Sequence, residues 1–76
     1  MTTGQTSALL GFICGIELRP TVPAGAVEAW HDVLADVDFD AAMAAVRKHY
    51  RLHETAERPP RLTPYAIRTA ARRGDR

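Results

Sequence analysis

The sequence predicts an all-α protein, a compact bundle of four short helices in a single domain. Apolar residues recur at spacings of three and four in successive segments, and turn-forming residues separate those segments. No run alternates apolar and polar residues in the way that a half-buried strand does. The 76 residues, 46% apolar and 25% charged, also have the composition of one small globular domain.

The first helix is expected over residues 6–18, with Thr3 or Thr6 as the residue that caps its free N–H groups. Gly11 and Gly15 fall four residues apart inside it, so this helix is expected to be irregular or to pack closely against a neighbour. Its apolar stripe consists of Leu9, Phe12, Ile13 and Ile16.

The second helix is expected over residues 23–35, because Pro23 suits a first helical turn and the preceding Arg19-Pro20 pair ends the first helix. Its apolar stripe centres on Trp30, which we expect at the middle of the core. The neighbouring His31 is expected at the edge of that core.

The third helix, expected over residues 39–54, carries the strongest helical pattern, and Asp38 is its expected N-cap. A proline-rich linker over 55–62 follows, and Thr63-Pro64 then begins a helix over 64–73. The third helix's apolar stripe is Phe39, Ala42, Met43, Val46 and Tyr50. In the fourth, Ile67 and either Ala70 or Ala71 should point inward, and the arginines Arg68, Arg72 and Arg73 outward.

Charge is distributed unevenly along the chain. Residues 1–46 hold six acidic side chains against one arginine, a net charge of −5, whereas residues 47–76 hold nine basic side chains against three acidic ones, a net charge of +6. Such a dipolar chain can steer oppositely charged partners. The alternative is that the acidic and basic parts pair with each other within one domain.

No residue pattern predicts catalysis, a metal site or a bound cofactor. Cys14 is the only cysteine, so it forms no internal disulfide and is expected to be buried as a small apolar residue. His49 and His53 are four residues apart, but Tyr50 stands where a metalloprotease helix has its glutamate. We therefore expect a protein that is not an enzyme and holds no metal or cofactor.

The apolar stretch 8–16 is too short to span a membrane, and no basic residue precedes it as in a signal peptide. The chain is therefore expected to be cytoplasmic, with no membrane partner. Two surfaces are candidates for binding other molecules. The acidic one, for a protein partner, comprises Glu28, Asp32 and Asp36, and the basic one, for nucleic acid or an acidic partner, comprises Arg61, Arg68, Arg72 and Arg73.

The stretch from Val27 to Tyr50 resembles the N-terminal helical domain of the phage replicative-helicase loader/inhibitor family. A tryptophan-bearing helix with a Leu-Ala-Asp turn leads to an alanine-rich helix headed by phenylalanine, and a linker and a short Pro-x-x-Ile helix follow. The positions that carry the resemblance are Trp30, Leu34, Ala35, Asp36, Phe39, Val46, Tyr50, Pro64 and Ile67.

The resemblance implies a non-enzymatic adaptor of phage or prophage DNA replication that binds the replicative helicase or an origin initiator. Members of that family also carry a C-terminal helicase-contacting segment, and the 76 residues stop before an equivalent of it. From the residues alone, two alternatives stay open. One is a small basic DNA-binding regulator that uses the arginine-bearing fourth helix, and the other is a homodimer that buries an apolar patch.

Overall fold

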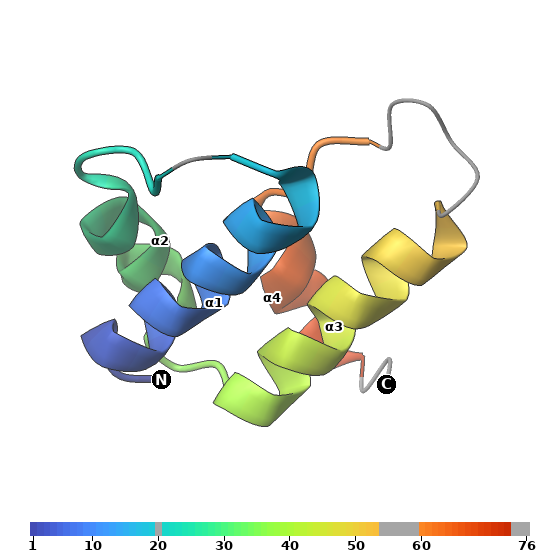
Figure 1. Ribbon diagram of the computed structural model, residues 1–76. Coiled ribbons are helices and arrows are strands. Elements are labelled where there is room, and N and C mark those ends of the chain that lie inside the picture. The colour runs from blue at the N-terminus through green and yellow to red at the C-terminus, as the bar shows by residue number, and fades with distance from the viewer. Residues whose placement is uncertain (20, 54–59, 74–76) are drawn as a thin grey trace.

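The computed structural model describes residues 1–19, 21–53 and 60–73, which form four helices and no strand. Each helix packs against two others, in the closed order α1, α2, α4, α3 (Figure 1). The predicted all-α bundle is confirmed. The helices are α1 (Thr3–Glu17), α2 (Ala26–Leu34), α3 (Phe39–Leu52) and α4 (Pro64–Arg72).

The core forms where the apolar faces of all four helices meet. The largest fully buried apolar side chains are Leu9, Leu34, Ile67 and Val46, one from each helix. Trp30 is only half-buried and packs against this cluster from outside, so its expected place at the middle of the core was wrong. Leu34, which is fully buried, takes the central position on α2 instead.

The start of α1 differs from the expectation. Its N-cap is Thr2, whose hydroxyl accepts from the backbone N–H of Gln5 at 3.1 Å, while the Gln5 side chain accepts from the Thr2 N–H at 2.9 Å. This reciprocal pair is a capping box, and it satisfies two N–H groups together. Thr6 is buried one turn later and donates its hydroxyl to the Thr2 carbonyl, and Thr3 is the first helical residue.

The two glycines of α1 neither interrupt the helix nor pack against another element. The helix is continuous from Thr3 to Glu17, and a Cβ placed on Gly11 or Gly15 would have no neighbouring atom within 4 Å. Both parts of the expectation, an irregular helix or close packing, were therefore wrong. The C-cap of α1 is Leu18, which adopts a left-handed conformation with φ of 58°.

The second helix begins at Ala26, three residues later than expected. The Ala26 N–H donates a hydrogen bond to the Pro23 carbonyl in a turn. Gly25, within that turn, adopts a left-handed conformation with φ of 78°. Because that conformation favours glycine, Gly25 rather than Pro23 marks the start of the helix. Pro20, part of the predicted stop signal, lies outside the described residues.

Helices α3 and α4 begin where they were expected to. Asp38 accepts from the Ala41 N–H at 3.0 Å and Thr63 from the Ala66 N–H at 3.2 Å, which confirms both N-caps. Ile67 is buried, and Ala70 and Ala71 both pack against the core. Residue 54, the expected end of the third helix, and residues 55–59 of the expected linker lie outside the described residues.

Candidate protein-interaction surface

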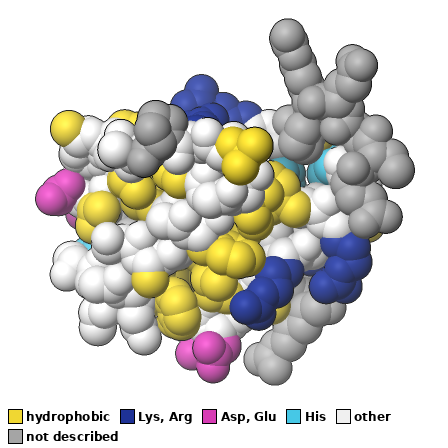
Figure 2. Space-filling view, viewed as in Figure 1, with side chains coloured by type: hydrophobic (Ala, Val, Ile, Leu, Met, Phe, Trp, Pro, Cys, Tyr) yellow, Lys and Arg dark blue, Asp and Glu magenta, His cyan; other side chains and the backbone are white. Residues whose placement is uncertain are grey.

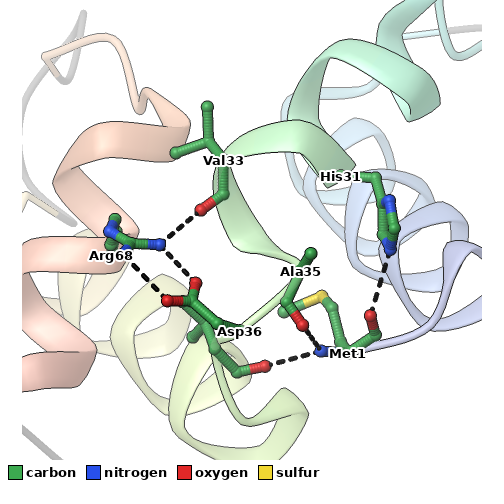
Figure 3. Close-up of polar contacts among 7 residues, drawn as sticks. Met1, His31, Val33, Ala35, Asp36 and Arg68 are labelled. Atoms are coloured by element: carbon green, nitrogen blue, oxygen red, sulfur yellow. Dashed lines mark hydrogen bonds and ion pairs between the residues drawn. The ribbon is translucent and has the colours of Figure 1, made fainter.

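The candidate site lies where α2 and α4 meet, because that contact brings the predicted acidic and basic surfaces together. The guanidinium of Arg68, on α4, forms two hydrogen bonds to the Asp36 carboxylate, one of them at 2.9 Å (Figure 3). It also donates to the Val33 carbonyl at 2.8 Å. The alternative in which the two charged parts of the chain pair within one domain therefore holds for this pair.

The ion pair changes the protonation of the Asp36 side chain. Its hydrogen bonds from Arg68, with further attraction from Arg72, lower the pKa of the Asp36 carboxyl below its ordinary value of 3.8. The same contact raises the pKa of the Arg68 guanidinium. Both groups are therefore charged at neutral pH, although the pair lies at the surface.

A shallow hollow beside this ion pair is lined by Asp32, Val33, Tyr65 and Arg68. Tyr65 is 68% exposed, so α4 presents a mostly exposed aromatic residue to solvent. A second hollow, next along the same contact, is lined by Asp36, Val37, Asp38, Ala41, Ala71 and Arg72. We call Asp32, Val33, Asp36, Tyr65, Arg68 and Arg72 together the α2–α4 surface.

The remaining predicted site residues are dispersed. Glu28 is exposed on α2, one turn before Asp32. Arg61 lines a different pocket beside the end of α1, and Arg73 is exposed at the C-cap of α4. The four candidate arginines thus do not form one continuous basic stripe.

The α2–α4 surface is held in place by the amino terminus. The Met1 ammonium group donates to the Ala35 carbonyl at 2.7 Å and to the Val37 carbonyl at 2.8 Å, at the C-terminal end of α2 (Figure 3). His31 donates from Nε2 to the Met1 carbonyl at 3.2 Å. A positive charge at a helix C-terminus stabilises the helix dipole, so these contacts fix the turn that carries Asp36.

Tyr65 was missed by the sequence reasoning, and the sequence did carry a signal for it. The inward positions of the fourth helix follow Ile67, and Tyr65 lies off that stripe. An aromatic residue on the outer face of an amphipathic helix indicates a contact surface, since tyrosine is enriched where proteins bind one another.

On another face, hydrophobic side chains reach the surface in a band where α1 lies beside α3, and Lys and Arg side chains border it (Figure 2). Among the apolar side chains of these two helices, Phe12 and Met43 are half-buried and Ile16 is 40% exposed. The Arg47 guanidinium lies over the Phe12 ring, 5.7 Å from its centroid. A homodimer, the remaining alternative, would bury apolar surface of this kind.

One histidine of the pair and the cysteine each contact a backbone carbonyl of another segment. The rings of His49 and His53 lie 5.1 Å apart, and His49 donates from Nε2 to the Pro60 carbonyl at 2.9 Å. Within the described ranges, no cluster of three or more His, Cys, Asp or Glu side chains could hold a metal ion. Cys14 is buried, as expected, with Sγ 3.8 Å from the Thr21 carbonyl oxygen.

Comparisons with known protein families, with curated proteins and with solved structures find no match to this chain. In the part of the chain that the structure describes, no helix has the length and apolar character needed to cross a membrane. The class that fold and surface define is a small all-α domain with a mixed-charge, aromatic-bearing contact surface.

Proposed function

We propose that this chain is a non-enzymatic cytoplasmic adaptor that binds another protein through the α2–α4 surface. The observation that carries the proposal is the exposed Tyr65 ring beside Asp32 and the Asp36–Arg68 pair. Tyrosine and arginine dominate the binding energy of many protein interfaces. A surface with charges of both signs selects a partner by complementarity rather than by apolar area alone.

The resemblance to the phage helicase loader/inhibitor family supplies the identity of the partner. We propose the replicative helicase or an origin initiator of a phage or prophage replication system. The proposed contact does not depend on the family's C-terminal segment, because the α2–α4 surface lies wholly within residues 32–72.

The test mixes the purified 76-residue chain with the purified replicative helicase, and separately with the initiator, of the organism or phage that carries the gene. Multi-angle light scattering should reveal a complex with one of them, and helicase binding should change the ATPase rate. A complex lost with Tyr65→Ala supports the proposal. No complex with either protein at concentrations of about 100 μM, which corresponds to binding weaker than about −5.5 kcal/mol, contradicts it.

The DNA-binding alternative is less favoured by the geometry. Arg68 is committed to Asp36, and Arg72 shares its hollow with Asp36 and Asp38, so carboxylates interrupt the basic face of α4. A phosphate backbone would meet these negative charges along with the arginines. Duplex DNA bound at low salt, with affinity falling steeply as salt rises, would establish the alternative.

A further inference from the structure

A half-open pocket lies where the end of α1, the start of α2 and the segment before α4 meet. Its volume is about 240 Å³. Its floor is apolar, since each of the four floor side chains is less than a tenth exposed. They are Leu10, Ile13, Cys14 and Leu62. Segments far apart in the sequence close the pocket, so it exists only in the folded chain.

Trp30 forms one wall, together with Pro23 and Ala26. The indole is half-buried, and none of the described residues accepts a hydrogen bond from its N–H group. Trp30 therefore offers the pocket a flat aromatic surface and leaves one polar donor available.

Among the described residues, Arg61 adds a positive charge to the rim that no carboxylate pairs with. The Glu17 carboxylate is held by Arg19 at 2.8 Å and by the Tyr50 hydroxyl at 2.5 Å, so it is fully engaged. Arg61 is exposed at the same rim and has no ion-pair partner among the described residues. An apolar pocket with an arginine among its lining residues complements an anion with an apolar body.

We propose that this pocket binds a small organic carboxylate, with its aliphatic or aromatic body on the apolar floor and its carboxylate on Arg61. The pocket is smaller than the 300–1,000 Å³ typical of drug-sized ligands, so the ligand has on the order of ten heavy atoms. Octanoate has this size and chemistry. The proposal is independent of the proposed adaptor function, because it involves neither Tyr65 nor the Asp36–Arg68 pair.

The chain contains its own two reporters for the test. Trp30 is the only tryptophan and Cys14 the only cysteine, and both line the pocket. Titration with octanoate should change the Trp30 fluorescence saturably, with half-saturation at about 1–10 mM, the range that ten heavy atoms at ordinary ligand efficiency give. Octanoate should also slow the reaction of Cys14 with a thiol reagent at least twofold.

Two ligand controls separate charge from apolar contact. Propionate has the carboxylate without the body, and octylammonium has the body with the opposite charge, so neither should saturate the signal in the same range. Among variants, Arg61→Gln should weaken octanoate binding about fivefold or more, and Arg61→Lys should retain most of it. Arg73→Gln, an exposed arginine outside the pocket, should bind octanoate as the unchanged chain does.

The proposal is overturned if octanoate causes no saturable change in Trp30 fluorescence, or if octylammonium binds as tightly as octanoate does. It is also overturned if folded Arg61→Gln binds octanoate as tightly as the unchanged chain. Circular dichroism establishes that each variant is folded. Because the titration uses this chain alone, its result does not depend on whether a helicase or an initiator binds the α2–α4 surface.

Discussion

Arg68 holds Asp36, 32 residues earlier in the chain, and the Val33 carbonyl with the same guanidinium. Helix α4 is thereby tied to the end of α2, and one residue of the predicted acidic surface pairs with one residue of the predicted basic surface. The pair is exposed to solvent, and its interaction is therefore screened by salt. Its main consequence is geometric, since it joins α4, which carries Tyr65, to the end of α2, which carries Asp32.

The Asp36–Arg68 pair makes stability depend on pH in the acid range. The folded-state pKa of Asp36 is lowered, so its contribution is present above the ordinary value of 3.8 and is lost as pH falls through the folded-state value. Asp36→Asn should lower the free energy of unfolding at neutral pH. Urea titrations between about pH 7 and pH 2 should show the difference between the two chains shrinking toward acid. A difference that stays constant across this range would contradict the account.

The exposed glycines of α1 predict substitutions that stabilise the fold. A Cβ at Gly11 or Gly15 meets no atom within 4 Å, and glycine costs about 1 kcal/mol relative to alanine inside a helix. Gly11→Ala and Gly15→Ala should each raise the unfolding free energy by up to about 1 kcal/mol. In a chain this short, that corresponds to a rise in melting temperature of about 4–8 °C.

Gly25→Ala is the matched control for these two substitutions. A Cβ added at Gly25 would also meet no atom within 4 Å. However, the φ of 78° at this position strains any residue that has a side chain. Gly25→Ala should therefore lower the melting temperature where the α1 substitutions raise it. Destabilisation by Gly11→Ala would show that α1 packs against something along its glycine face.

The amino terminus contributes to stability through its charge. Acetylation of Met1 removes the positive charge and leaves a single N–H donor, where the ammonium now bonds the Ala35 and Val37 carbonyls. Stability should fall by about 1–2 kcal/mol. Chemical synthesis of both forms allows thermal melts to be compared, with mass spectrometry to verify an intact Met1. Equal melting temperatures would show that these contacts do not persist in solution.

Tyr50 makes stability depend on pH in the alkaline range. Burial, and then its hydrogen bond to Glu17, raise the pKa of the Tyr50 hydroxyl above its ordinary value of 10.0. Above that pH the unfolded chain ionises Tyr50 before the folded chain does, so stability declines as pH rises. The decline should be smaller in Tyr50→Phe, measured by urea unfolding on either side of about pH 10. Parallel pH profiles for the two chains would be the contrary result.

Local sequence signals predicted much of the fold. Asp38 and the Thr63-Pro64 pair have N-cap chemistry that acts over one turn, and the stripe from Phe39 to Tyr50 repeats within a single helix. These features depend only on neighbours in the sequence, so the sequence alone predicts their positions.

Long-range contacts decided the rest. The start of α1 is an exception, because Thr2 and Gln5 have the spacing of a capping box and Thr3 and Thr6 lack it, so a local signal was missed there. The choice between Pro23 and Gly25 depends on a backbone conformation. The Asp36–Arg68 pair and the Met1 contacts to α2 each join residues more than 30 positions apart. Asp32 lies on α2 and Arg68 and Arg72 lie on α4, whereas Asp36 follows α2 and Arg61 precedes α4. The sequence gives no register between α2 and α4 that would bring these side chains together.

The central claim is that the α2–α4 surface binds the partner protein. The most direct measurement compares helicase and initiator affinities of Tyr65→Ala and Leu52→Ala by isothermal titration calorimetry. The two residues are exposed to the same extent, 68% for Tyr65 and 69% for Leu52, but Leu52 lies at the end of α3, outside that surface. The account predicts that Tyr65→Ala weakens binding by about 2 kcal/mol, roughly 30-fold, while Leu52→Ala leaves it unchanged. Equal affinity for both variants and the unchanged chain would contradict the claim.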